Sequence, residues 1–185
     1  MIIGLCGAAG AGKNTVAERL CLEHKFVPLA FADPIYEAVS AITGLTVEEL
    51  QDRSRKEQPL GWLDASPRKL LQTLGTEWGR KMIHEEIWVM ATMQKIESSP
   101  GVNFCITDVR FPNEAAAIKA RGGVVWRVVR PGFGVLDGEA ASHESERGIP
   151  DEYVDDEIVN DGGIFALQTA VDAAMSRLQA ATMVV

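Results

Sequence analysis

MIIGLCGAAGAGKNT, residues 1–15, joins a short apolar run to a glycine-rich turn and then to the start of a helical pattern. Ile2–Cys6 is typical of a buried strand, and a helix is expected from about Lys13 to His24. GAAGAGKNT (Gly7–Thr15) matches the phosphate-binding loop G-x-x-x-x-G-K-[ST] except at the residue after the lysine. The alternative is a glycine-rich turn with a solvated lysine. The strand before the motif and the helix after it favour the phosphate loop.

This loop predicts a site for the phosphates of a nucleoside triphosphate. Its N–H groups point inward as an anion nest, the helix N-terminus adds a favourable dipole, and Lys13 can reach the β and γ oxygens. Asn14 stands where a Ser or Thr hydroxyl usually binds Mg²⁺, and its amide oxygen can ligate the ion directly or through water. The residues expected to contact the triphosphate are Gly7, Ala8, Ala9, Gly10, Ala11, Gly12, Lys13, Asn14 and Thr15.

Strands and helices alternate along the rest of the chain. Further strands are expected at Val27–Phe31, Val102–Thr107, Val124–Val129 and Asp156–Val159. Helices are expected after Asp33, after Ser66-Pro67 (with Leu70, Leu71, Leu74 and Trp78 facing the core), and from about Ile164 to Gln179. This alternation predicts an α/β fold of three layers, in which helices cover both faces of a five-stranded, mostly parallel sheet. No linker or repeat divides the sequence, so a single domain over residues 1–185 is expected.

Two acidic residues follow strands at the end where such sheets bind ligands. Asp108 comes after the strand Val102–Thr107, at the usual place of the aspartate that helps to hold Mg²⁺ in phosphate-loop proteins. Arg110 would lie at the same edge of the sheet and contact a phosphate. The alternative is that Asp108 caps the helix starting near Pro112, with Arg110 as its surface partner.

Asp33 holds the matching place after the second strand. It could bind a substrate hydroxyl or steer proton transfer, or it could cap the next helix, since Pro34 suits a first turn. Residues 130–150 form a long glycine-rich polar loop, which predicts a lid that excludes water, with Arg130 at its root to neutralise a transferring phosphoryl group.

The composition narrows the class of partner. A formal net charge of −8 argues against nucleic acid as a partner, and no apolar run is long enough to span a membrane. The three cysteines (Cys6, Cys21 and Cys105) contain no metal-type pair. Cys6 and Cys105 lie in apolar runs that predict strands, so buried, reduced thiols and a cytoplasmic protein are expected.

Several blocks of the sequence carry a more specific resemblance. They are GAAGAGKNT, FADPIYEA, SPRKLLQTLGTEWGRKMIHEEIWV, ITDVRFPNEA, HESE and NDG, spread from Gly7 to Gly162. Together they are similar to the deoxynucleoside monophosphate kinases encoded by bacteriophages, within the P-loop nucleoside monophosphate kinases. In that family the residue after the loop lysine is commonly Asp, so Asn14 is less unusual there. A phage origin would place the protein in the host cytoplasm.

The resemblance implies a P-loop kinase fold, ATP and Mg²⁺ as cofactors, and transfer of the γ-phosphoryl group to a deoxynucleoside monophosphate. It makes Lys13, Arg130 and Asp33 the catalytic candidates, and residues 33–98 the monophosphate-binding segment. Within that segment it implies that Arg68 and Arg80 grip the acceptor phosphate, although their position also suits a solvated helix face. Asn160 of the NDG block is implied to border the adenine, and a simple turn is its alternative.

Two other functions fit parts of the same pattern. Another small-molecule P-loop kinase, such as dephospho-coenzyme A kinase, would use a similar phosphate loop and lid. A non-catalytic nucleotide switch is the second alternative, but the chain lacks an NKxD motif and would give its arginine-bearing middle segment no purpose. The expected partners are small-molecule nucleotides, and the oligomeric state, a homodimer included, is open.

Overall fold

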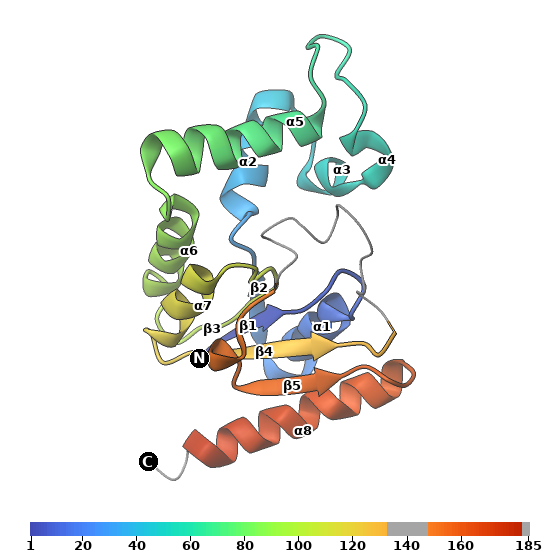
Figure 1. The fold of residues 1–185 in the computed structure, drawn as a ribbon, viewed down its shortest axis with the longest axis vertical. Helices are drawn as coiled ribbons and strands as arrows, with labels where there is room; N and C mark the ends of the chain where they lie inside the picture. The colour runs from blue at the N-terminus through green and yellow to red at the C-terminus, as the bar shows by residue number, and fades with distance from the viewer. Residues whose placement is uncertain (133–147, 183–185) are drawn as a thin grey trace. The chain divides into compact units, whose positions relative to one another are not determined.

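A five-stranded parallel sheet forms the centre of the larger part of the molecule (Figure 1). The structure is a computed structural model, and it describes residues 1–132 and 148–182. Its strands are β1 (Ile2–Cys6), β2 (Phe26–Leu29), β3 (Asn103–Ile106), β4 (Val124–Val129) and β5 (Asp156–Val159), in the order β2-β3-β1-β4-β5. Every neighbouring pair is parallel. The predicted α/β class is therefore confirmed, and only the ends of β2 and β3 differ from the sequence prediction.

Helices cover both faces of this sheet. Ile3 and Leu5 of β1 are fully buried in a core shared with α1 (Lys13–His24) and α8 (Ile164–Thr182). The alternate position, Gly4, faces the other way, where a Cβ would lie 2.6 Å from the Ile118 side chain of α7 (Pro112–Lys119). Successive strand residues point to opposite faces, so α7 and the α1–α8 pair form the two outer layers.

The chain forms two compact units. The first contains the sheet and consists of residues 1–30 and 99–185, and the second is the inserted segment 31–98. The second unit is helical and has a small core of its own, centred on Val39, Leu50 and Leu71. Its helices are α2 (Asp33–Thr43), α3 (Val47–Gln51), α4 (Arg53–Lys56), α5 (Pro67–Gln72), η1 (Thr73–Ile83) and α6 (Ile87–Glu97).

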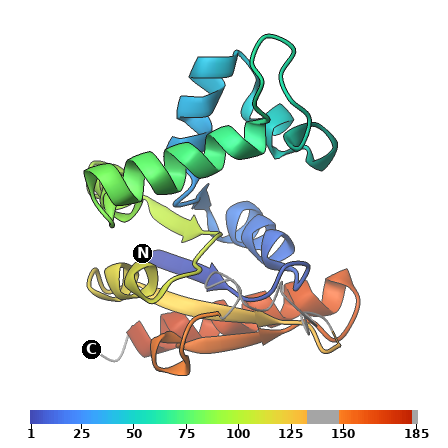
Figure 2. The same ribbon diagram turned by 45° about the horizontal axis from the view of Figure 1, so that its top comes forward.

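The helix predicted after Ser66-Pro67 changes its hydrogen bonding part of the way along. It begins as expected, with Ser66 Oγ accepting from the Lys69 N–H at 3.3 Å, but from Thr73 onward it is a π-helix, η1. Figures 1 and 2 draw the two parts as one uninterrupted rod. The π register rotates later side chains away from the α-helical stripe. Trp78 is consequently 42% exposed, so its predicted core position was wrong.

Most of the predicted lid, including His143–Glu146, lies outside the described residues. The described chain resumes at Gly148 and leads through the short helix η4 (Asp151–Tyr153) to β5. The helices that the structure describes include none that is both long and apolar enough to cross a membrane. The three cysteines are free thiols, and burial raises the pKa of both Cys6 and Cys105 above the ordinary range.

An ion-pair cluster ties α1 to α8. Asp172 accepts two hydrogen bonds from Arg19 (3.0 Å from Nε and 2.6 Å from Nη2), and its Oδ1 lies 2.9 Å from His24 Nε2. The bonds from Arg19, the largest cause, and from His24 lower the pKa of Asp172 from 3.8 to about 2. The cluster therefore favours the folded state through the ionised carboxylate.

We expect Asp172→Asn to reduce the free energy of unfolding at neutral pH by about 1 kcal/mol, a modest value because the carboxylate is partly exposed. A carboxyl whose folded pKa is depressed stabilises the fold above its unfolded pKa and stops doing so as the pH falls through the folded value. The difference in free energy of unfolding between wild type and variant should therefore become smaller as the pH falls from about 4 toward 2. Urea unfolding across this range measures it. Glu23→Gln is the matched control, since Glu23 pairs with the same arginine at 3.3 Å and is more exposed. A difference that is constant with pH would contradict the assignment.

Candidate functional site

The glycine-rich loop after β1 is held in a conformation that ordinary side chains disfavour. Gly7, Gly10 and Gly12 have φ values of 127°, 80° and 112°. At Gly7 there is also no room, because a Cβ would lie 2.2 Å from the carbonyl oxygen of Val128. The start of the loop therefore lies flush against the backbone of β4. This close approach explains why glycine is needed at Gly7, beyond its use in wrapping a phosphate.

The loop ends at a helix N-terminus whose first N–H groups receive no side-chain cap. Gly12 is the N-cap residue of α1 and has no side chain to accept from the following amides. Uncapped N–H groups and the helix dipole together favour an anion at this point. Lys13 arches back over the loop, and its Nζ donates to the carbonyl oxygens of Gly7 at 2.6 Å and Ala8 at 2.9 Å. The ammonium group is thus held directly above the loop.

Asn160 supports the loop from the end of β5. Its Nδ2 donates to the Ala11 carbonyl at 2.9 Å, and its backbone N–H donates to Val129 at 2.7 Å. The same Nδ2 would lie 2.7 Å from a Cβ on Gly12. The amide side chain therefore fixes the position of the loop, across 149 residues of sequence. Neither interpretation of Asn160 from the sequence, a contact with adenine or a simple turn, included this bond to the loop.

A cavity of about 830 Å³ opens beside the loop, entirely within the first unit. It brings together four residues predicted from separate parts of the sequence: Lys13, Asp108, Arg110 and Arg130. Ala8, Ala9, Ala11 and Gly7 also line it, whereas Gly10, Gly12, Asn14, Thr15 and Asn160 do not. Among the residues that the structure describes, its charged lining side chains are Lys13, Arg110, Arg127 and Arg130 against Asp108 and Asp151. A cationic excess in a chain of net charge −8 favours an anionic ligand.

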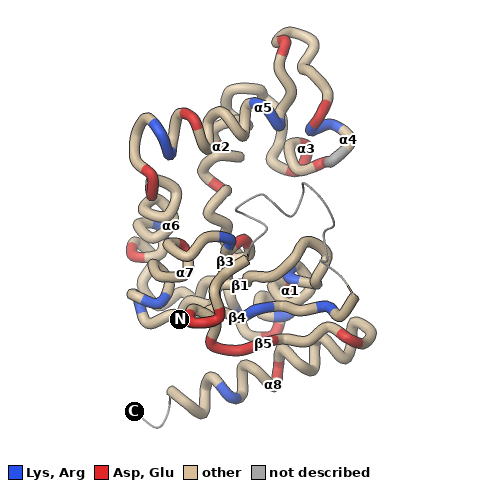
Figure 3. The backbone as a smooth tube through the Cα atoms, in the orientation of Figure 1, with Lys and Arg blue, Asp and Glu red and all other residues tan. Residues whose placement is uncertain are grey.

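Arg127 is a cavity residue that the sequence analysis missed. It lies within β4, where Figure 3 marks basic positions in blue, between the buried Trp126 and Val128. Its guanidinium donates to Asp151 and to the carbonyl of Ile149. These bonds hold Ile149 and Asp151, at the end of the predicted lid, against the sheet. The available signal was a single arginine inside an otherwise apolar strand, VVWRVV.

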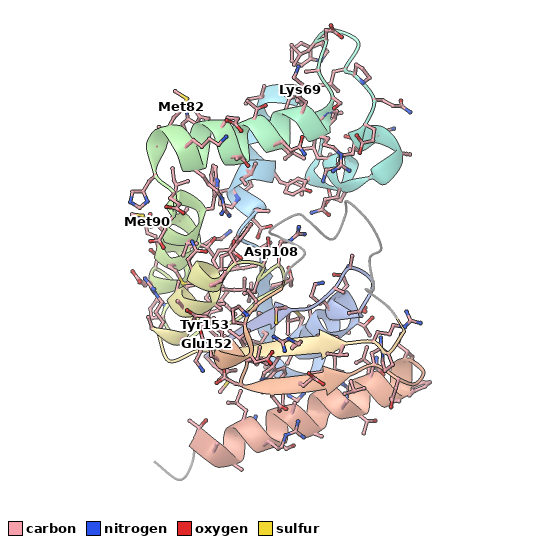
Figure 4. All side chains as sticks on the ribbon, viewed as in Figure 1. Lys69, Met82, Met90, Asp108, Glu152 and Tyr153 are labelled. Carbon is pink, nitrogen blue, oxygen red and sulfur yellow. The ribbon has the colours of Figure 1, made fainter. Side chains whose placement is uncertain are left out.

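Asp108 lies just beyond the carboxyl end of β3, at the edge where the prediction placed it (Figure 4). The alternative, that it caps α7, was wrong. Phe111 is the residue before that helix, and the buried carboxylate of Glu114 reaches back to accept from the N–H groups of Arg110 and Phe111 at 2.8 and 3.1 Å. Glu114 therefore serves the helix end, and Asp108 lines the cavity.

The residues predicted to hold a metal ion are dispersed. Asn14 is exposed on the first turn of α1 and lies outside the cavity lining, whereas Asp108 is part of that lining. Within residues 1–132 and 148–182, no group of three His, Cys, Asp or Glu side chains could form a protein-only metal site. One carboxylate beside a phosphate site fits Mg²⁺, which is usually held by one or two carboxylates together with substrate phosphates.

The remaining predicted residues belong to the second unit. Asp33 is the first residue of α2, and Ala32 is the N-cap, so the alternative in which Asp33 caps this helix was wrong. Arg68, on α5, pairs with Glu57 and is exposed. Arg80 is half-buried on η1. The second unit thus carries two arginines on one continuous helical rod.

Comparisons with known proteins agree on a family. The sequence profile described as deoxynucleotide monophosphate kinase matches residues 45–171, beginning well beyond the phosphate loop. A deoxynucleoside-5'-monophosphate kinase of Escherichia phage T5 is 29% identical, covering 86% of this chain and 89% of its own. A protein of Acanthamoeba polyphaga mimivirus named as a deoxynucleotide monophosphate kinase is 33% identical, covering 79% of this chain and 80% of its own. Dephospho-CoA kinase from Campylobacter jejuni shares the fold, with a TM-score of 0.54 at 16% identity over 98% of each chain.

Proposed function

The chain belongs to the deoxynucleotide monophosphate kinase family, and on that premise we propose that it uses ATP to phosphorylate a deoxynucleoside monophosphate. It is a phosphotransferase of the P-loop kinase fold. The observation that carries the donor assignment is the cationic cavity beside the glycine loop, which gathers Lys13 and three arginines. Such a cavity suits the triphosphate of ATP, because phosphoryl transfer depends mainly on positioning and on neutralising charge.

On the donor side, Lys13 is proposed to bind the β and γ phosphates. To do so its ammonium group exchanges the carbonyls of Gly7 and Ala8 for phosphate oxygens. The uncapped N–H groups of α1 receive the phosphates, and Arg130 neutralises the transferring group. Mg²⁺ would be held by Asp108, with Asn14 reaching it directly or through water, and would supply charge neutralisation between the phosphates.

On the acceptor side, the second unit is proposed to bind the monophosphate. Arg68 and Arg80 would each pair with phosphate oxygens through a guanidinium. Arg110, which lines the cavity of the first unit, is proposed to contact a substrate phosphate. Glu57 already pairs with Arg68, so this arginine would exchange a carboxylate for a phosphate on binding. Asp33 is proposed to contact the substrate or to steer its proton. It is the first residue of α2, and the N-cap position before it is Ala32, which makes no side-chain capping bond.

A substrate panel tests the proposal directly. With ATP and Mg²⁺, we expect turnover of at least one of dGMP, dTMP and dCMP to its diphosphate, and no turnover of dephospho-coenzyme A. A coupled assay for ADP and chromatography of the products measure both. Phosphorylation of dephospho-coenzyme A alone would overturn the proposed acceptor. Nucleotide binding without transfer to any acceptor would support a switch protein instead.

A further inference from the structure

The π-helix η1 carries Arg80 and is packed against a tryptophan of the same unit. In a π-helix each N–H donates to the carbonyl five residues earlier. The register is visible at the end of η1, where the His84 N–H donates to the Gly79 carbonyl at 3.0 Å. By the same rule, the Gly75 carbonyl accepts the hydrogen bond from the backbone N–H of Arg80. That carbonyl also accepts a 2.8 Å hydrogen bond from the buried indole N–H of Trp88.

Glycine at residue 79 allows the indole to come this close. A Cβ at Gly79 would lie 2.4 Å from Cζ2 of Trp88, inside any permitted contact. Trp88, on α6, is only 7% exposed, and the neighbouring ring of Trp78 lies 6.4 Å away between ring centroids. Glycine in a helix interior destabilises the helix by about 1 kcal/mol relative to alanine. Glycine is nevertheless needed at residue 79, because a larger residue would leave no room for the indole of Trp88.

The two contacts act on the turn that directs Arg80. In an α-helix the Gly75 carbonyl would accept from the backbone N–H of residue 79, whereas in the π register it accepts from that of residue 80. A carbonyl oxygen has two lone pairs, so it can accept from the helix and from the indole at once. The indole thus fills the second acceptor position on the carbonyl that orients Arg80. Met82 and Met90, which Figure 4 labels on η1 and α6, are both largely exposed.

We propose that Trp88 is a positioning residue: through Gly75 and Gly79 it holds η1 in the π register and so fixes the direction of Arg80 toward the acceptor phosphate. The proposal rests on the proposed function, in which Arg80 binds the monophosphate. It assigns Trp88 no contact with the substrate. Loss of the indole bond should therefore weaken monophosphate binding through Arg80 and leave the ATP side unchanged.

Trp88→Phe keeps an aromatic ring and removes the N–H. We expect the KM for the monophosphate to rise about tenfold, the loss of one well-directed charged hydrogen bond, while the KM for ATP stays within about twofold. Trp62→Phe is the matched control, since Trp62 is in the same unit and 64% exposed, and its KM values should match wild type. A folded Trp88→Phe with an unchanged monophosphate KM overturns the proposal.

A double-mutant cycle separates positioning from a general structural effect. Arg80→Ala should raise the monophosphate KM, and adding Trp88→Phe to it should change the KM no further. Additive effects would show that Trp88 acts on binding by another route and would overturn the proposal. An Arg80→Ala variant that keeps the wild-type KM would overturn it too, but would leave the proposed function standing. The proposed function fails only if the wild-type protein phosphorylates no deoxynucleoside monophosphate.

Two further measurements keep the proposal testable if Trp88→Phe does not fold. Gly79→Ala pushes the indole away and should also raise the monophosphate KM about tenfold, whereas Gly61→Ala, where a Cβ meets nothing within 4 Å, should leave it unchanged. In the unmodified protein, the indole N–H resonance of Trp88 should shift when the monophosphate binds. Equal KM values for the two alanine variants, or a resonance that does not move, overturns the proposal.

Discussion

Lys13→Met is expected to lower kcat/KM for phosphoryl transfer roughly 10³-fold, the scale seen when a charge-stabilising donor is removed from a transition state. The change keeps a flexible, unbranched side chain of similar length and removes the only cation in residues 7–15. The fold should survive, since the two bonds from Nζ are to loop carbonyls at the edge of the cavity. Steady-state kinetics with ATP and the accepted monophosphate measure the loss.

Lys25→Met provides the control for Lys13→Met. Lys25 is the C-cap of the same helix, is exposed and carries the same charge, so its kinetics should match wild type. An active Lys13→Met variant would remove Lys13 from the transfer step. Equal losses in both variants would show that the helix, and not the loop ammonium, is responsible.

Gly7→Ala is expected to damage both the fold and the activity. The added Cβ would lie 2.2 Å from the carbonyl oxygen of Val128, and the residue would have to adopt a φ of 127°. The loop must therefore move off β4, which we expect to cost about 3 kcal/mol and lower the melting temperature by about 10 °C. Displacing the loop N–H groups by about 1 Å should also lower kcat/KM roughly 10²-fold.

Thermal unfolding and steady-state kinetics on the same preparation measure both effects of Gly7→Ala. Gly163→Ala is the control, because a Cβ there meets nothing within 4 Å. We expect its melting temperature and kinetics to remain close to wild type. A Gly7→Ala variant as stable and active as wild type would mean that the loop does not lie flush against β4.

Local pattern was sufficient to predict the sheet and to place the glycine loop, Lys13 and Asp108 at one edge of it. β1, β4 and β5 have their predicted bounds. For β1 the reason is that a parallel strand covered on both faces needs a continuous apolar stretch, whereas β5 is an edge strand with a single buried residue. The glycine loop, Lys13 and Asp108 follow from motif and strand order, because the carboxyl ends of parallel strands meet at one edge. These features depend on a few neighbouring residues.

The features that the sequence did not reveal depend either on contacts between different elements or, for Arg127, on one side chain in an otherwise apolar strand. The π register of η1 requires Trp88 to lie against Gly79, and helical periodicity by itself predicted a continuous α-helix with Trp78 buried. The bond from Asn160 to the loop joins residues 149 positions apart. Arg127 was missed because the valines and tryptophan around it predict a buried strand, and that pattern carries no information about a single polar side chain within it.

The insertion of residues 31–98 has a consequence for how the protein folds. β2 and β3 pair along their length, from Phe26–Asn103 to Leu29–Ile106, yet the whole second unit lies between them in sequence. Closing a loop of that length in a disordered chain costs about 4 kcal/mol of entropy before the first strand bond forms. The helices of the insertion form through short-range contacts, which are the faster ones. We therefore expect this segment to collapse first, which shortens the effective loop between β2 and β3 before the two strands pair.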